Sequence, residues 1–395
     1  MKNNILIIGA GASGLLCAIR LKCSCPSCSV TVLERMPRAG KKLLATGNGR
    51  CNLSNRCAET AAYFGDGTLA HTVIEKYNVE KTLDFFLSLG LLTRSDSEGR
   101  IYPYAMQSAG VLEILTLQCQ RLGVKIITDC TVTAVKKKKG FEVYADKGVF
   151  TCDVLVFACG GKSAPELGSN GSCYEIISSL GHTVIPPFPA LVQMKSSSKY
   201  PRLLSGIRHK CKISLEIDGE IRDEKSGEVL FTDYGLSGIC TMQLSRHVHE
   251  SEGARVAAVL DLVPEMGRTE LSALIETSRA ALPESETWLT GLLPGKLPAI
   301  IARQGKNDPA LMAEITKNWR LIITGTLGFK FSQVTAGGID TGEINSETLE
   351  SRLIDSLYFC GEVLNVDGDS GGFNLQWCWS SALNAADSII QKKEL

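Results

Sequence analysis

The chain lacks an excess of charge of either sign, and histidine is scarce. Its 395 residues include 42 lysines and arginines against 42 aspartates and glutamates, with five histidines. Proteins whose main partner is a nucleic acid or an anionic membrane usually carry a basic excess. The charge balance therefore argues against both partners and leaves a small-molecule substrate. None of the histidines stands in a segment that marks it as catalytic: His71, His182, His209, His247 and His249.

Long apolar runs are also missing, with one exception at the start of the chain. There, Lys2 precedes an apolar stretch that reaches Ile19 and resembles a signal peptide in composition. Three glycines lie inside this stretch at phosphate-binding spacing, so we interpret it as part of the fold. No other segment reaches the roughly 18 continuous apolar residues that a membrane helix needs. The sequence predicts a soluble, cytoplasmic protein.

Cysteine, by contrast, is abundant, with 15 residues scattered mostly through apolar stretches. Buried free thiols in a reducing compartment account for most of them. Cys23, Cys25 and Cys28 have a spacing that allows a metal or a disulfide. They fall between the first expected helix and the second expected strand, and no second cluster completes four ligands. We therefore expect no metal site.

The most informative feature that is present is a glycine-rich turn at residues 9–14, GAGASG, behind the apolar run 5–8. A second apolar run, 30–33, ends on Glu34. Strand, tight turn, helix, strand and acid form the pattern of a dinucleotide-binding βαβ unit. The glycines let the backbone approach a pyrophosphate, the helix N-terminus supplies N–H donors, and the acid suits a ribose hydroxyl. The sequence therefore predicts a bound dinucleotide, either NAD or FAD.

Apolar periodicity predicts the order of the remaining elements. Helical patterns occupy residues 79–89, 111–122 and 374–392, and residues 99–103 are extended. A meander of short strands is expected at 132–137, 141–144 and 149–151, feeding an apolar strand at 153–158. A mostly β insert follows the proline cluster at 186–189, with strands at 207–217, 228–231 and 256–261. Helical patterns fill 268–324, and 329–339 is again extended and glycine-rich.

These patterns predict an α/β fold built on a discontinuous Rossmann-type FAD-binding domain. The expected domains are residues 1–190 with 330–395 for the cofactor, 191–266 for a β-rich insert and 267–329 for a helical insert. FAD is favoured over NAD because two further glycine-bearing strand ends are present. Gly160 and Gly161 end the strand after the meander, and Gly361 ends the next-to-last strand. The glycine-rich loop 367–372 then opens a helix whose N–H groups suit the flavin carbonyl region.

A third glycine-rich loop, residues 41–52, completes the expected cofactor site. Its glycines permit close backbone approach, while Lys42 and Arg50 offer positive charge to a phosphate or to the pyrimidine edge of a flavin. Cys51 has two interpretations, a reactive thiol beside the ring or a thiol that only packs. The sequence leaves both open.

Several motifs together resemble those of one bacterial family. They are TGNGRCNLSN at 46–55, GRIYP at 99–103, LFTDYGLSG at 230–238, TAGGI at 335–339, GE at 361–362 and GGFNLQW at 371–377. The chain is similar over nearly its whole length to single-chain NAD(P)/FAD-dependent oxidoreductases. That family includes aminoacetone oxidases and ene-reductases of 3-oxo bile acids and steroids. The resemblance implies an FAD domain interrupted by a β-barrel-like piece and a small helical piece.

The resemblance also implies roles for individual residues. Glu34 would hold the adenosine ribose, Val132 would contact adenine through its backbone, and Asp367 would help to close the far side of the flavin. One departure is Asp233, which stands where many relatives carry histidine, so a proton-transfer role for that histidine has no counterpart here. The full set of expected FAD contacts is Gly9, Gly11, Ala12, Ser13, Gly14, Glu34, Arg35, Lys42, Leu43, Asn48, Gly49, Arg50, Cys51, Asn52, Val132, Cys159, Gly160, Gly161, Gly361, Glu362, Asp367, Gly372, Phe373, Asn374 and Leu375.

The expected reaction is reduction of an activated C=C bond in an apolar substrate such as a 3-oxo steroid or bile acid. NAD(P)H would be a transient donor, because the sequence has no second Rossmann fingerprint. The proton would come from Tyr234, Tyr102 or Cys51, which we take as the catalytic candidates. The alternatives are a flavin amine oxidase acting on a small amine such as aminoacetone, and a flavoprotein without catalytic turnover.

Overall fold

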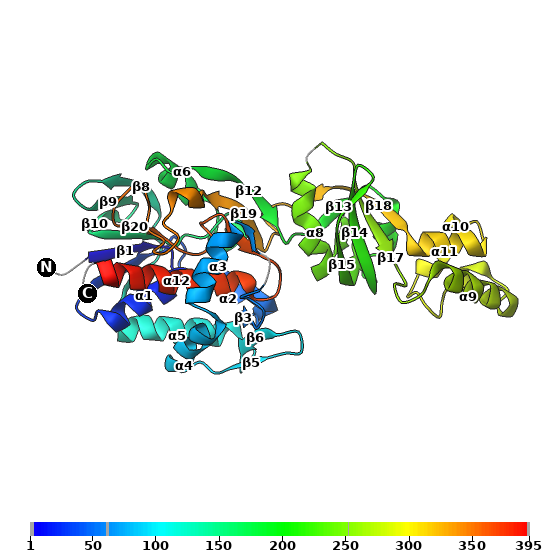
Figure 1. Ribbon diagram of the computed structural model, residues 1–395, viewed down its shortest axis with the longest axis horizontal. Coiled ribbons are helices and arrows are strands. Elements are labelled where there is room, and N and C mark those ends of the chain that lie inside the picture. The colour runs from blue at the N-terminus through cyan, green and yellow to red at the C-terminus, as the bar shows by residue number, and fades with distance from the viewer. Residues whose placement is uncertain (1–3, 61–62, 252, 393–395) are drawn as a thin grey trace. The chain divides into compact units, whose positions relative to one another are not determined.

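The computed structural model describes residues 4–60, 63–251 and 253–392, and these form two compact units (Figure 1). The first unit combines Met1–Phe188 with Val334–Leu395, and the second is Pro189–Gln333. The second unit is thus inserted into the first. The predicted discontinuous Rossmann-type fold is confirmed. The expected helical domain at 267–329 clusters with the barrel as one unit, and its separate boundaries stay a prediction.

A five-stranded parallel sheet forms the centre of the first unit, in the order β20-β11-β1-β2-β7. Its strands are β1 Asn4–Ile8, β2 Ser29–Leu33, β7 Lys125–Ile127, β11 Val154–Phe157 and β20 Leu357–Phe359. Every residue of β11 and β20 is buried. Strands that are covered on both faces consist of continuous apolar runs, and such runs predict β1, β2 and β11 from the sequence.

Two long helices, α1 (Ala12–Ser24) and α12 (Phe373–Lys392), pack side by side over this sheet (Figure 1). Most of α1 is buried, because it lies between the sheet, α12 and α5 (Ser108–Arg121). The predicted helix at 374–392 is confirmed as α12. The predicted meander is also confirmed, as β8 Val132–Lys137, β9 Phe141–Ala145 and β10 Gly148–Cys152.

Shorter elements of the first unit carry the loops of the candidate site. The helices are α2 Lys41–Ala45, α3 Gly67–Lys76, α4 Val79–Ser88 and α6 Ser172–Ser179, with short 3₁₀ turns at Thr46–Gly49, Pro165–Leu167 and Thr341–Glu343. The strands are β3 Ser54–Asn55, β4 Tyr63–Gly65, β5 Thr93–Ser95, β6 Arg100–Pro103, β19 Val334–Ile339 and β21 Val366–Gly368, and β12 Val184–Ala190 continues into the first two residues of the second unit. The extended segment expected at 329–339 is a strand only from Val334.

The second unit is a closed barrel of six strands in the order β13-β16-β15-β14-β17-β18. Its strands are β13 Met194–Ser196, β14 Arg208–Ile217, β15 Glu220–Phe231, β16 Gly235–Ser237, β17 Val256–Asp261 and β18 Trp319–Thr326. Its helices are α7 Lys199–Leu203, α8 Ile239–Glu250, α9 Arg268–Ala281, α10 Leu297–Gln304 and α11 Pro309–Lys317, with a 3₁₀ turn at Ser285–Thr287.

The prediction of helical structure through residue 324 is wrong at its end. Residues 319–326 form β18, in which Trp319, Leu321 and Ile323 are buried while the residues between them are exposed. This alternation has the period of a strand, and pairing with β17 and β13 fixes it in the barrel. Helix α8 was not expected inside the β-rich insert. No helix among residues 4–60, 63–251 and 253–392 is long and apolar enough to cross a lipid bilayer.

Candidate cofactor site

The turn between β1 and α1 depends on glycine for packing at two positions. Gly9 has a φ of +106°, and a Cβ there would lie 2.4 Å from the Ala158 carbonyl oxygen. A Cβ at Gly14 would lie 1.9 Å from the Gly9 carbonyl oxygen. Side chains are therefore excluded because strand, turn and helix are in direct contact.

Gly11 is different, because it faces open space. A Cβ built on Gly11 meets no atom within 4 Å. Gly11 is also the N-cap of α1, and no side chain caps the helix. The first backbone N–H groups of a helix have no partner within it, so they remain available to an anion that occupies the open space. This geometry fits a pyrophosphate.

Glu34 lies beside the same turn, directly after β2. Its carboxylate is nearly buried and accepts hydrogen bonds from Ala10 N and Met36 N, each at 2.8 Å. The neighbouring Arg35 donates weakly to the Gly168 carbonyl at 3.4 Å, and its Nε is buried with no hydrogen-bond partner. A carboxylate held in place with an unsatisfied guanidinium nitrogen beside it fits a ligand that carries hydroxyl groups.

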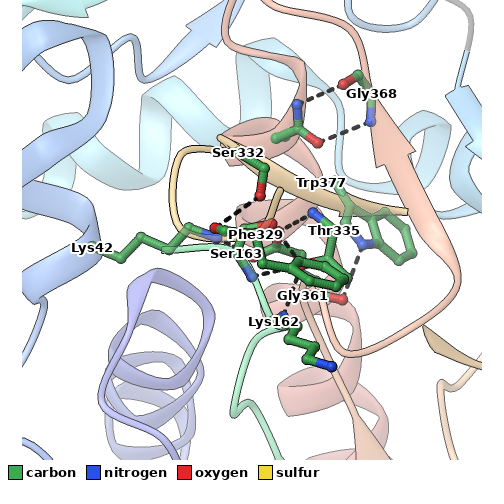
Figure 2. A network of polar contacts seen from close by, with 11 residues as sticks. Lys42, Lys162, Ser163, Phe329, Ser332, Thr335, Gly361, Gly368 and Trp377 are labelled. Carbon is green, nitrogen blue, oxygen red and sulfur yellow. Dashed lines mark hydrogen bonds and ion pairs between the residues drawn. The ribbon is translucent and has the colours of Figure 1, made fainter. Parts of the chain in front are cut away.

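An ion pair links two of the glycine-bearing segments. Lys42 Nζ lies 2.6 Å from Glu362 Oε2, and both side chains are half-buried (Figure 2). The other carboxylate oxygen of Glu362 accepts from Thr335 N at 2.8 Å. A Cβ on Gly160 would lie 3.9 Å from Glu362 Oε2. Helix α2, the segment after β11 and the segment after β20 therefore meet at Glu362.

Thr335 holds the backbone directly after the glycine pair that follows β11. Its Oγ1 accepts from Lys162 N at 2.8 Å and from Ser163 N at 3.0 Å (Figure 2). A Cβ on Gly161 would lie 2.4 Å from the same oxygen. Sequence reasoning did not give Thr335 a role in the site. Only its place in the TAGGI motif marked it, and nothing local to that motif indicates a partner 172 residues away.

The loop after α2 contains an unusual run of left-handed residues. Gly47, Asn48 and Gly49 have φ values of 58°, 53° and 82°, and Cys51 has 58°. Positive φ over successive residues turns backbone N–H groups to one side, which makes a concave cradle for an anion or a carbonyl oxygen. Residues 47–50, including Arg50, are exposed.

Cys51, in contrast, is fully buried beneath that loop. Burial raises the pKa of its thiol to about 12, and a hydrogen bond with Thr46 opposes this only in part. The thiol therefore stays protonated at neutral pH. A protonated thiol lacks the nucleophilicity of a thiolate, so the reactive-thiol interpretation loses support and a packing or proton-donating role remains.

The start of α12 presses against β3. A Cβ on Gly372 would lie 2.2 Å from the Ser54 carbonyl oxygen, and Asn55 Nδ2 donates to the Gly371 carbonyl at 2.9 Å. Asn52 lies at this junction with a buried Oδ1 that has no hydrogen-bond partner. An amide oxygen left unsatisfied here fits a ligand donor such as a flavin N–H.

The preceding loop is fixed by Asn374, the second residue of α12. Its Oδ1 accepts from Gly368 N at 2.9 Å, and its Nδ2 donates to the Gly368 carbonyl at 2.7 Å (Figure 2). This paired contact closes the loop onto the first turn of its own helix. The first turn of α12 is therefore held in place against the loop that precedes it.

A buried polar network ties α12 to two other segments. Gln376 is fully buried, its Oε1 accepts from Ser54 Oγ at 2.6 Å, and its Nε2 donates to Thr82 Oγ1 at 2.9 Å. Gly361 is fixed in the same way, since its carbonyl accepts from Trp377 Nε1 at 3.1 Å (Figure 2). Such buried networks orient neighbouring elements, because breaking any one contact leaves a polar group unsatisfied.

Comparison with known sequences identifies the chain. The profile of the HI0933-like protein Rossmann domain matches residues 3–388. The chain belongs to this family. The resemblance inferred from the motifs and the predicted fold class are both confirmed.

Two proteins of named function are similar to the chain over almost all of its length. A 3-dehydro-bile acid delta(4,6)-reductase from Clostridium scindens is 39% identical, covering 99% of this chain and 100% of that protein. A ribosomal RNA dihydrouridine synthase from Haemophilus influenzae is 31% identical, covering 98% of each.

Solved structures with similar folds are distant in sequence from this HI0933-like chain. A flavocytochrome c3 fumarate reductase gives a TM-score of 0.51 at 13% identity, covering 98% of this chain and 78% of that chain. A 3-ketosteroid-Δ4-(5α)-dehydrogenase from Rhodococcus jostii RHA1 gives 0.50 at 14% identity, covering 97% of each. At these identities the likeness shows the fold alone.

The structure of the HI0933-like chain brings most of the expected FAD contacts together in the first unit. The contacts at the β1–α1 turn, the end of β2, the α2 loop, the end of β11 and the start of α12 adjoin one another through the interactions above. Other members of the set take the following positions: Ala12 and Ser13 in the first turn of α1, Leu43 buried in α2, Val132 nearly buried at the start of β8, Cys159 half-buried after β11, Asp367 buried in β21, and Phe373 and Leu375 half-buried in α12. Their cofactor roles stay predictions.

The catalytic candidates are divided between the two units. Tyr102 lies half-buried on β6, where burial raises the pKa of its phenol although Arg50 and Arg100 favour the anion. Tyr234 belongs to the second unit, between β15 and β16. All fifteen cysteines are free thiols, and no metal-binding group was found within the described residues.

Proposed function

We propose that this chain is an FAD-dependent reductase of a carbon–carbon double bond conjugated to a carbonyl group, with a 3-oxo steroid or bile acid as substrate. The observation that carries the proposal is the 39% identity to a 3-dehydro-bile acid delta(4,6)-reductase across 99% of the chain. The aligned region, which covers 99% of the chain, includes both the cofactor segments and the inserted barrel.

The second relative supports the same reaction type. Dihydrouridine is uridine with its ring C=C bond saturated, and that bond is conjugated to a carbonyl group. Both relatives are therefore named for adding hydrogen to a bond of the same electronic class. Hydride adds to the β carbon of such a system and a proton adds to the α carbon, while negative charge develops on the carbonyl oxygen.

The first unit offers a fitting set of groups for FAD. The open space at Gly11 suits the pyrophosphate, Glu34 suits the ribose, and the unsatisfied Asn52 oxygen suits a ring N–H. When bound, FAD supplies the hydride transfer that no side chain can perform. The α12 N-terminus would place its partial positive charge where the reduced ring carries negative charge.

The proton would come from a phenol, and Tyr102 is the first candidate. Its raised pKa keeps the phenol protonated at neutral pH, so it can donate, and the positive charges of Arg100 and Arg50 would favour the phenolate that remains. Tyr234 is the second candidate, on the barrel. Cys51 is the third, since its buried thiol also retains its proton.

The electrons would be supplied by NADH or NADPH binding transiently. The sequence has one GxGxxG turn followed by a spaced acid, at residues 9–14 and 34, and that turn would be occupied by FAD. A nicotinamide would therefore bind only long enough to pass on its hydride.

A ribosomal RNA substrate is the second candidate, favoured by the 31% identity to a ribosomal RNA dihydrouridine synthase over 98% of both chains. Two observations rank it lower, the higher identity to the bile acid reductase and the equal numbers of basic and acidic residues. The amine oxidase alternative gains nothing from either relative.

Steady-state turnover with three substrates tests the proposal. Purified holoprotein is mixed anaerobically with NADH or NADPH and either a 3-oxo-4,6-diene bile acid, a ribosomal RNA fragment or aminoacetone. We expect nucleotide oxidation only with the bile acid, and a product that has gained two hydrogens per reduced bond. Turnover with the ribosomal RNA fragment alone would show that the substrate is RNA and not a bile acid. Amine oxidation upon admitting oxygen, without reduction of the dienone, would refute the reductase.

A further inference from the structure

The turn that joins α1 to β2 carries two cysteines, Cys25 and Cys28, that the proposed function leaves unused. We propose that they form a thiol–disulfide exchange site for a low-molecular-weight disulfide, with Cys25 as the attacking thiol and Cys28 as the resolving thiol. The proposal concerns the protein's own thiols and stands independently of the reductase activity.

The backbone places the two cysteines at the two ends of one tight turn. Cys28 N donates to the Cys25 carbonyl at 3.2 Å, which closes a four-residue β-turn over Pro26 and Ser27. The end residues of a β-turn have Cα atoms within about 7 Å, and a disulfide needs a Cα separation of about 4.4–6.8 Å. The Cys28 thiol itself donates to the Cys25 carbonyl at 2.9 Å, so its sulfur lies against the residue it would bond.

A lysine fixes the turn and supplies positive charge. Lys22 Nζ donates to the Pro26 carbonyl at 2.6 Å and to the Cys28 carbonyl at 3.0 Å. The ammonium group therefore lies inside the turn. Its positive charge acts on Cys28, where it opposes the rise in pKa caused by burial and so favours the Cys28 thiolate in the second step of the exchange.

The Cys25 thiol is more acidic than the Cys28 thiol, as disulfide exchange in this order requires. Burial raises the pKa of the Cys25 thiol, but hydrogen bonds with Ser27 and Cys28 outweigh this and leave the pKa below its usual value. Burial and the adjacent Cys25 sulfur raise the pKa of Cys28 to about 11. Cys25 is thus the better thiolate, and Cys28 keeps its proton until a mixed disulfide forms.

The position of the turn distinguishes it from the other buried thiols. Cys25 is 4% exposed and Cys28 is 3% exposed, yet Ser24, Pro26 and Ser27 around them are all exposed. The two cysteines therefore lie in a turn at the surface of the first unit. Cys119, for comparison, lies on α5 with no exposed surface, and burial raises its pKa to about 12.

The exchange balances in two steps. The Cys25 thiolate bonds to one sulfur of the disulfide RSSR and releases RS⁻. The Cys28 thiol then loses its proton to solvent, attacks the Cys25 sulfur and releases the second RS⁻. The protein has lost two electrons as a dithiol becomes a disulfide, and RSSR has been reduced to two thiols.

Mass mapping of the holoprotein after exposure to glutathione disulfide tests the site. In the wild type and in Cys23→Ser we expect a Cys25–Cys28 disulfide that dithiothreitol reverses. In Cys28→Ser we expect glutathione to remain on Cys25, and in Cys25→Ser we expect no adduct on Cys28. Cys119→Ser is the buried control and should behave as the wild type.

Two results would overturn the proposal. One is recovery of Cys25 and Cys28 as free thiols while the exposed Cys23 and Cys57 are modified. The other is accumulation of glutathione on Cys28 in Cys25→Ser. Flavin content, measured on the same samples, reports on the cofactor site separately, so failure of either proposal is recognised without the other.

Discussion

Lys42 Nζ lies 2.6 Å from Glu362 Oε2 although 320 positions separate the two residues in the sequence. Glu362 also accepts from Thr335 N, so this one carboxylate joins helix α2 and the start of β19 to the segment after β20. Neither residue is fully exposed, with side-chain exposures of 27% and 15%. Three segments that lie far apart in the sequence are therefore held together at the Glu362 carboxylate.

The first prediction concerns the ion pair between Lys42 and Glu362. In a double-mutant cycle of Lys42→Met and Glu362→Gln, we expect a coupling of about 1 kcal/mol in the free energy of unfolding of the apoprotein, because each single change leaves a half-buried polar group without its partner. Urea unfolding measures it. The surface pair Lys138 and Glu142 is the matched control and should show coupling near zero. Additive effects at Lys42 and Glu362 would contradict the structural role.

Two glycines of the first turn should respond in opposite ways. Gly11→Ala adds a methyl group into open space, so we expect the unfolding free energy of the apoprotein to change by about 1 kcal/mol or less, while FAD affinity falls at least about tenfold. Gly14→Ala places a Cβ 1.9 Å from a carbonyl oxygen, so we expect about 1–3 kcal/mol of destabilisation before any ligand is added. Flavin fluorescence titration and urea unfolding separate these effects. Unchanged FAD binding by Gly11→Ala would show that the pyrophosphate lies elsewhere.

Glu34 gives a third prediction. Glu34→Ala removes the carboxylate that faces the turn, and hydrogen bonds to a charged group contribute about 1.5–3 kcal/mol. We therefore expect FAD affinity to fall about 10- to 100-fold by the same titration. Glu113→Ala, on the exposed face of α5, is the control and should leave the affinity unchanged. Equal affinities for both variants would remove Glu34 from the site.

Sequence periodicity predicts most of the individual helices and strands but not the contacts between elements that are distant in the sequence. The apolar runs of β1, β2 and β11 and the helix α12 were predicted because each carries its burial pattern in its own residues. The sequence pattern predicts helix at β18, because the alternation of buried Trp319, Leu321 and Ile323 with exposed residues is short and follows three helices. Its burial comes from β17 and β13, which lie elsewhere in the chain.

The same limit applied at the site. The glycine turns and Glu34 could be recognised from spacing alone, since a phosphate-binding turn needs those residue types in a fixed order. The contact between Gln376 and Ser54 spans 322 positions, and no property of either residue indicates the other. Long-range hydrogen bonds of this kind become visible only when the fold is known.

His182 makes stability depend on pH. It is buried, with Nδ1 at 3.1 Å from Glu343 Oε2 and Nε2 at 2.9 Å from Ser351 Oγ. Burial lowers its pKa, and the attraction of Glu343 opposes this only in part. As pH falls through the usual histidine range near 6.5, the unfolded state takes up a proton before the folded state does. Stability therefore decreases on acidification, by at most about 1.4 kcal/mol per pH unit for this one proton.

Urea unfolding of the apoprotein between about pH 7.5 and 5.5 measures this dependence. We expect His182→Gln to flatten the slope in that window whatever its effect on absolute stability. Glu343 does not interfere, because its pKa lies below the usual value for glutamate, and its contribution is lost only at more acidic pH. An unchanged slope in His182→Gln would assign the dependence to other groups.

Tyr102 is expected to act on the chemical step. Tyr102→Phe removes the phenol proton and little else, so we expect kcat to fall about 10²- to 10⁴-fold with KM changed much less. Tyr234→Phe and Cys51→Ala test the other two candidates under the same conditions. A fall in kcat for Tyr234→Phe alone would transfer the role to the barrel. If none of the three lowers kcat, the proton comes from water.

The most direct test of the reductase is a single turnover of the reduced holoprotein. The bound flavin is reduced anaerobically with dithionite, and the protein is then mixed in a stopped-flow instrument with a 3-oxo-4,6-diene bile acid. We predict reoxidation of the flavin that is much faster than in buffer and saturates with bile acid, together with a product that carries two additional hydrogens. A flavin that stays reduced with the dienone, yet is reoxidised by a ribosomal RNA fragment or only by oxygen, would contradict the account.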